Sequence, residues 1–233
     1  MHEHFSYIGL LVKDPILQKF YTAIILVMVL ILVEFYVSRK VSTEEKRKNY
    51  IIPKRFSLVG LFDFFVEAFV HYQDGILGVE NRKYAPFTGS VFLFLLLANL
   101  LGLVPGMAAI TTTVTINLAV ALVAFIYFNS MGVKVNGLCG YLKHFAGPVI
   151  GLAPLIFCIE VFSTSLRVLT LNLRLYWNIS ADHLLMSSFM DLSPILGVVT
   201  YFLGFFVAFV QAFVFTTLTI VYIQLATQHS EEE

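Results

Sequence analysis

Long apolar runs are the feature that most limits what this chain can fold into. Residues 16–37, 88–104 and 114–133 form three runs with few or no charged side chains. A helix of about 20 apolar residues is about 30 Å long, which matches the hydrocarbon core of a bilayer. With 58% hydrophobic residues and a mean hydropathy of +0.84, the chain carries more apolar surface than a soluble domain of 233 residues buries. The sequence therefore predicts an integral membrane protein.

Two further apolar runs, residues 155–189 and 194–227, are longer than a membrane crossing requires. As helices they would measure about 52 and about 51 Å. Asp191 and Pro194 between them are typical of a helix start. Because both runs are apolar almost end to end, we expect a long antiparallel hairpin that is steeply tilted in the membrane. The predicted fold class is all-α, a single polytopic membrane domain over residues 1–233 with about five membrane helices.

Residues 56–79 form a run of a different kind, rich in phenylalanine but interrupted by charges. On a helix over this range, the charged residues share one face and the opposite face is aromatic. We expect an interfacial amphipathic helix here, not a span. We interpret the polar face as solvated in preference to an ion site, and its residues are Asp63, Glu67, His71 and Asp74.

Basic residues set the expected orientation. A tight cluster of them follows the first span, and others follow residues 79 and 133. Because cytoplasmic loops carry an excess of Lys and Arg, we expect the N-terminus outside and the C-terminus in the cytoplasm. The first run lacks a small-residue cleavage site and is expected to be a retained anchor. The cluster consists of Arg39, Lys40, Lys46, Arg47, Lys48, Lys54 and Arg55.

Composition narrows the functional classes. The 15 basic and 15 acidic residues give a formal net charge of +0, which is no sign of a nucleic-acid partner. Cys139 and Cys158 lack metal-site spacing and are interpreted as small apolar residues. His2 and His4 are interpreted as solvated terminal residues. The sequence contains no glycine-rich phosphate loop. No metal and no other cofactor is expected.

The charged residues inside the 155–189 run require a functional explanation, because ionisable groups in a membrane segment are costly. With Arg174 as zero on a helical wheel, Arg167 falls at about 20° and both Glu160 and Asn178 at about 40°. Arg174 is about nineteen residues into its helix, too deep to snorkel easily to the interface. We expect it to face a carboxylate on another chain, because a fixed cation favours the ionised carboxylate and blocks direct proton leak.

The outer end of the same helix carries a second pair. His183 falls at about 180° on the wheel and Asp182 at about 80°, so the helix separates His183 from the face of Glu160. Asp182 can hold His183 in one tautomer, as a proton relay near neutral pH requires. The alternative is that the two residues only satisfy each other near the outer interface.

Four uncharged polar residues in the apolar runs are candidates for a functional role, and two of them have a second interpretation. Gln211 either hydrogen-bonds to the preceding arm or supports Arg174. Asn99 either hydrogen-bonds to another helix or lines a water path. Thr115 and Asn117, near the outer end of the third span, are further candidates for lining a water path.

Three motifs, in order along the chain, resemble those of subunit a of the F-type rotary ATP synthase. Residues 99–105 read NLLGLVP, similar to the N-L-L-G-L-x-P ending of a family helix. Residues 173–178 read LRLYWN and residues 181–185 read ADHLL, similar to the signature L-R-L-x-x-N-x-x-A-G/D-E/H. Residues 211–215 read QAFVF, similar to the Q-A-F/L-I/V-F segment of the last helix. The likeness runs from about residue 87 to residue 222, and the first ninety residues match only in layout.

The resemblance implies a non-catalytic stator that works with a ring of c subunits, b-type peripheral stalk subunits and the remainder of an ATP synthase. It implies proton translocation through two offset half-channels, most often in a bacterial inner membrane. In this interpretation Arg174 faces the ring carboxylates. The other residues divide into Gln211 and Asn178 beside Arg174, Glu160 and Arg167 at the inner half-channel, and Asp182 and His183 at the outer one.

The chain departs from the family pattern at two positions. Gly204 stands where many relatives carry a second ionisable group, and we expect Asp182 to compensate for it. Arg167 stands where lysine often occurs.

Two other functional classes fit the sequence less well. A stand-alone secondary transporter or ion channel predicts inverted repeats or broken helices, and the sequence shows neither. An intramembrane enzyme needs a paired nucleophile and base or metal ligands on facing helices, and Ser163, Ser165 and His183 do not supply a persuasive pair.

Overall fold

Helices make up all the regular structure that the computed structural model describes. It describes residues 14–41, 58–104, 107, 110–146 and 193–227, together with separate positions between residues 159 and 189 that are all helical. This confirms the all-α prediction. The elements are α1 (Pro15–Val41), α3 (Leu58–Leu77), the 3₁₀ helix η2 (Val79–Tyr84), α4 (Ala85–Leu103), the 3₁₀ helix η3 (Ile110–Thr112), α5 (Val114–Ala146) and α7 (Pro194–Thr227).

Four described helices are long and apolar enough to cross a membrane. They cover Ile16–Tyr36, Val79–Leu103, Val114–Gly137 and Leu196–Thr227. These match the predicted runs at 16–37, 88–104, 114–133 and 194–227, because apolar length alone decides such segments. The fifth predicted membrane helix, 155–189, falls largely outside the described residues.

The helix of the third span is longer than the predicted run of residues 114–133. α5 continues to Ala146 beyond a kink at Gly137, whose φ of 70° is one that residues with a side chain rarely adopt. Gly137 therefore redirects the chain, and a further helical stretch follows it.

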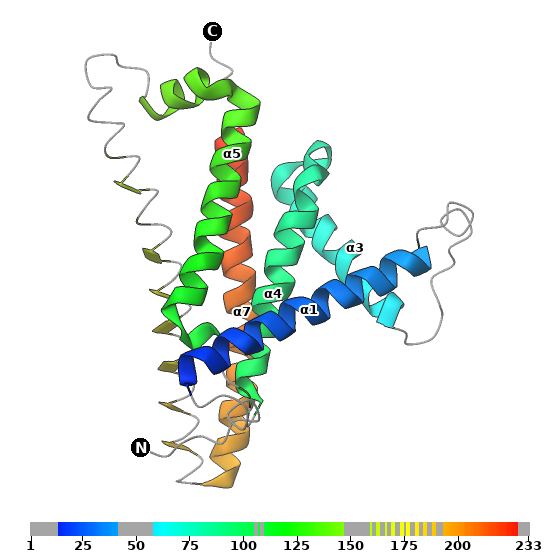
Figure 1. Cartoon of the computed structure of the whole chain (residues 1–233), viewed down its shortest axis with the longest axis vertical. Helices are drawn as coiled ribbons and strands as arrows, with labels where there is room; N and C mark the ends of the chain where they lie inside the picture. Colours follow the sequence, from blue (N-terminus) through cyan, green and yellow to red (C-terminus); the bar gives the residue numbers. More distant parts are fainter. Residues whose placement is uncertain are drawn as a thin grey trace.

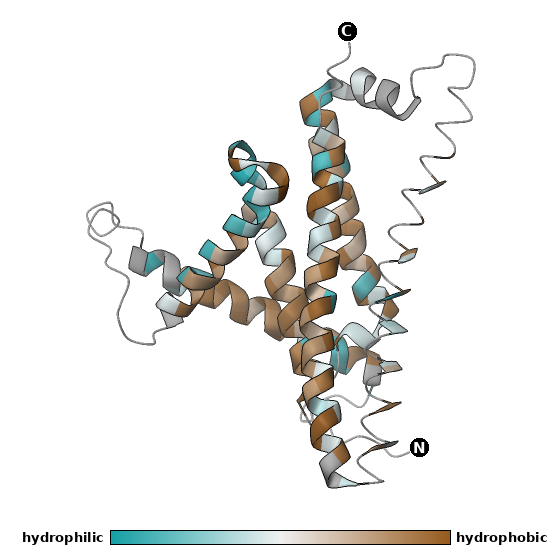
Figure 2. Ribbon diagram, turned by 180° about the vertical axis from the view of Figure 1, so that it is seen from behind, coloured by the Kyte–Doolittle hydropathy of each residue, from teal (hydrophilic) through white to brown (hydrophobic). Residues whose placement is uncertain are grey.

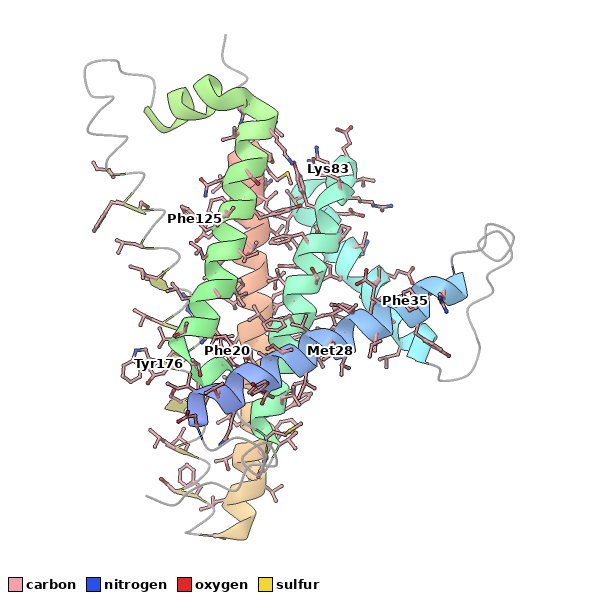
Figure 3. The ribbon with its side chains drawn as sticks, viewed as in Figure 1. Phe20, Met28, Phe35, Lys83, Phe125 and Tyr176 are labelled. Atoms are coloured by element: carbon pink, nitrogen blue, oxygen red, sulfur yellow. The ribbon has the colours of Figure 1, made fainter. Side chains whose placement is uncertain are left out.

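Two helix directions are present in the bundle. α4, α5 and α7 run alongside one another, and α1 crosses their direction, as Figure 1 shows. Crossing helices cannot all stand perpendicular to one membrane plane, and the predicted tilt of α7 stays a prediction. The helices of the bundle consist largely of apolar residues (Figure 2), and Phe20, Met28 and Phe35 are exposed along α1 (Figure 3).

The core lies where α4, α5 and α7 meet. α4 buries residues at three- and four-residue spacing, which places them on one helical face. Leu95, Ala212 and Phe215 are fully buried in this contact. The cluster is formed by Val91, Phe92, Leu95, Ala121, Ala124, Ala212 and Phe215.

α3 separates polar and aromatic residues only in part, since Phe64 is 74% exposed and the Asp74 side chain only 11%. Glu67 and His71 are exposed, whereas Phe65 and Phe69 pack against the core. The Arg82 guanidinium donates to both carboxylate oxygens of Asp74, at 2.7 to 3.2 Å, and holds the pKa of that carboxyl below its usual value. α3 is not among the helices apolar enough to span, and its interfacial position stays a prediction.

The turn between α3 and η2 depends on Gly78. Its φ of 81° and ψ of 156° lie in a region that only glycine occupies without strain. We predict that Gly78→Ala lowers the free energy of unfolding by about 1–3 kcal/mol. The matched control is Gly75→Ala, because a Cβ at helical Gly75 meets nothing within 4 Å. Thermal unfolding in detergent measures both, and equal melting temperatures for the two variants would contradict the prediction.

Candidate functional site

Two of the seven residues predicted for proton translocation are among the described residues, namely Arg174 and Gln211. The other five fall outside them, so their predicted roles stay predictions. They are Glu160, Arg167, Asn178, Asp182 and His183.

Arg174 is helical and exposed. Its neighbours Leu173 and Trp177 are also exposed, at 48% and 64% of their surface. The described part of this segment follows the direction of α7 on the side of the bundle away from α3, with Tyr176 labelled in Figure 3. Among the described residues no carboxylate lies within ion-pair distance of Arg174. Among the described residues, the guanidinium therefore has exposed apolar side chains as neighbours.

In contrast to Arg174, Gln211 is buried. Its side chain is only 4% exposed, and the adjacent Ala212 and nearby Phe215 are fully buried. An amide at such a site is retained only with hydrogen-bond partners, since burying it alone costs about 1–3 kcal/mol. The structure thus places Gln211 inside the helix contact of α7.

Asn99 makes the helix-to-helix hydrogen bond that was one of its two interpretations. Its Nδ2 donates to the carbonyl oxygen of Ala208 at 3.2 Å, which joins α4 to α7. Ala208 lies one turn before Gln211. The Oδ1 atom of Asn99 is buried and has no hydrogen-bond partner among the described residues. A role in lining a water path stays a prediction.

The two remaining water-path candidates differ in exposure. Asn117 is 1% exposed, and its Nδ2 donates to the carbonyl oxygen of Thr111 at 2.6 Å. That bond closes the connection between η3 and α5. Thr115 is exposed. Neither observation tests contact with water.

Gly204 has a packing role that its place in the sequence motif did not suggest. It is buried, and a Cβ added there would lie 2.8 Å from Cδ2 of Leu103 on α4. Gly204, Ala208 and Ala212 recur every four residues on the buried face of α7, and small residues at this spacing let helices approach closely. That spacing is a signal from which the α4 contact could have been found.

Further polar contacts between helices were missed from the sequence. Thr88 of α4 donates through Oγ1 to Oε1 of Gln73 on α3, and both side chains are buried. Gln73 lies on the aromatic face of its helix, which was the available signal. Two other bonds reach α7, between the hydroxyls of Tyr72 and Thr217 at 2.8 Å and from Asn136 Nδ2 to the carbonyl of Ala226 at 3.0 Å. The described residues contain no group of three or more His, Cys, Asp or Glu side chains placed to hold a metal.

Comparison with known proteins decides the family. The model of the family described as ATP synthase A chain matches residues 20–224. The chain belongs to this ATP synthase A chain family. It is 44% identical over 186 residues to ATP synthase subunit a of Bdellovibrio bacteriovorus, covering 79% of this chain and 81% of that one. It is 32% identical over 231 residues to ATP synthase subunit a of Helicobacter hepaticus, covering 98% and 97%.

Membership of the ATP synthase A chain family confirms the resemblance inferred from the three motifs. Together with the four long apolar helices, it identifies an integral membrane protein. The match extends from residue 20, so it includes most of α1 and all of α3, which the motifs did not reach.

The close approach of Gly204 and Leu103 generates a double-mutant prediction. Gly204→Ala brings a methyl group against the flexible end of Leu103, which moves at modest cost, so we expect a loss of about 1 kcal/mol. In a Leu103→Ala background the same substitution should be nearly neutral, because the opposing atoms are absent. Thermal unfolding of the four proteins in detergent gives the coupling free energy. Additive effects would contradict the contact.

Proposed function

We propose that this chain is the proton-translocating stator subunit of an F-type ATP synthase. It couples proton flow to rotation and carries out no catalytic chemistry itself. The family supports the complex to which it belongs. The observation that carries the proposal is the exposed Arg174 among exposed apolar side chains.

A guanidinium in this position suits a moving carboxylate partner. Arginine keeps its charge in an apolar contact, whereas lysine readily loses it when buried. The positive charge favours the ionised form of each carboxylate that passes, so the carboxylate releases its proton before it reaches Arg174. The same charge repels a proton that would cross directly. Rotation of a ring of c subunits is then required for net transfer.

Two offset half-channels complete the proposed path. Glu160 and Arg167 line the inner one, His183 and Asp182 serve the outer one, and Asn178 and Gln211 flank Arg174. This division rests on the helical angles of the sequence. Position 204 is a glycine and supplies no ionisable side chain, so the outer relay is proposed to rest on Asp182 and His183. Thr115 and Asn117 are proposed to line water paths, whereas the bond to Ala208 favours the helix-to-helix role for Asn99.

The proposed surroundings follow from the same function. The chain contacts the c-subunit ring, b-type peripheral stalk subunits and lipid, and resides in a bacterial inner membrane, as the bacterial relatives suggest. Its N-terminus is outside and its C-terminus is cytoplasmic. A stand-alone transporter or channel is not favoured, because the family match spans nearly the whole chain.

Arg174→Ala tests this function. We expect ATP-driven proton pumping by membrane vesicles to fall by about 100-fold or more, since unpairing a desolvated carboxylate costs about 3 kcal/mol or more. The matched control is Arg39→Ala, which removes an exposed arginine near the end of α1 that packs over Phe35. The control should pump normally. Normal pumping by Arg174→Ala, with the complex assembled, would contradict the proposed function.

A further inference from the structure

α4 and α7 are held in one antiparallel register by two neighbouring contacts. Asn99 bonds to the carbonyl of Ala208, and one turn further along α4 Leu103 meets Gly204, one turn earlier on α7. Gln211 follows Ala208 by three residues. The bonded amide of Asn99 therefore lies within a turn of the amide that the proposed function places beside the arginine.

A polar contact between α4 and α7 can fix their register, which apolar packing alone does less well. Apolar helix surfaces tolerate alternative registers, and a single buried asparagine can select one of them at some cost in stability. A slip by one residue moves a helix by about 1.5 Å along its axis. Misplacement of a reacting group by about 1 Å is enough to lower a rate about 100-fold.

The apolar surroundings of Asn99 support a functional reason for the residue. The adjacent Ala98 packs with Leu26 and Ile110, and burying an amide among such side chains is costly. Leucine would fill a similar volume without burying a polar group, so stability alone does not favour asparagine here. The bond to α7 is the feature that leucine would remove.

We propose that Asn99 is a positioning residue for proton translocation. Its amide fixes the height of α7 on α4 and thereby the height of Gln211 relative to Arg174. The inference rests on the proposed function, because it assumes that Gln211 works beside Arg174.

Asn136 provides a matched control. It also donates an amide hydrogen to a carbonyl of α7, that of Ala226, at 3.0 Å. Ala226 is about 22 Å along the helix from Gln211, whereas Ala208 is about 4.5 Å from it. Loss of either bond removes similar chemistry, but only Asn99 acts close to Gln211.

The experiment compares Asn99→Leu with Asn136→Leu in membrane vesicles that contain the whole complex. The initial rate of ATP-driven proton pumping is measured and normalised to the amount of assembled complex. For Asn99→Leu we expect the pumping rate to fall by about tenfold or more, which is within the loss of about 100-fold that a misplacement of about 1 Å can cause. For Asn136→Leu we expect the pumping rate to fall by less than about twofold. Equal losses in both variants, or normal pumping by Asn99→Leu, would overturn the proposal.

Asn99→Asp keeps the test decisive if the leucine variant does not assemble. A protonated carboxyl donates to the Ala208 carbonyl, and an ionised one cannot. The flanking Ala98 packs with Leu26 and Ile110, so the surroundings are apolar and favour the protonated form. Pumping relative to the native chain should therefore be retained at pH 6.5 and decline towards pH 8.5. A ratio that does not change with pH would overturn the proposal.

Failure of this inference is distinguishable from failure of the proposed function. If Arg174→Ala abolishes pumping while Asn99→Leu pumps normally, the function stands and the positioning role is wrong. If Arg174→Ala pumps normally, the function itself is wrong.

Discussion

The contact between α4 and α7 is the constraint on which the rest of the structure depends. In a membrane, helices gain little from the hydrophobic effect when they associate, so close packing and hydrogen bonds must hold them. Gly204, Ala208 and Ala212 present small side chains that allow this closeness, and Asn99 adds the polar bond. α5 and α3 then fasten the same helix through Asn136 and Tyr72.

This arrangement gives the two ends of the proposed site opposite environments. Gln211 is sealed in the helix contact, whereas Arg174 lies on a surface with exposed Leu173 and Trp177. A buried amide has a fixed position, and an exposed charge is available to another chain. Such a division suits a subunit that stays still while its partner moves past. The catalytic chemistry of the complex does not need to be present in this chain.

The sequence predicts the membrane helices well because apolar length is a local property. It does not predict the contacts that order them, because the bonded residues are far apart along the chain. Asn99 and Ala208 are 109 residues apart, and Tyr72 and Thr217 are 145 apart. The extension of α5 beyond residue 133 was not predicted. Glycine tolerates many backbone conformations, so its presence at position 137 does not indicate a kink with a further helical stretch after it. Arg174 was identified from the sequence because a permanent charge in an apolar run is rare whatever surrounds it.

We expect the face of Arg174 to meet another subunit, and the packed contact between α4 and α7 to exclude other chains. Cysteine cross-linking in the assembled complex tests it directly, with single cysteines at Trp177 and at the fully buried Leu95 in a background without native cysteines. We predict a cross-link from position 177 to a carboxylate-bearing ring subunit and none from position 95. A cross-link to the ring from position 95, or none from position 177, would contradict it.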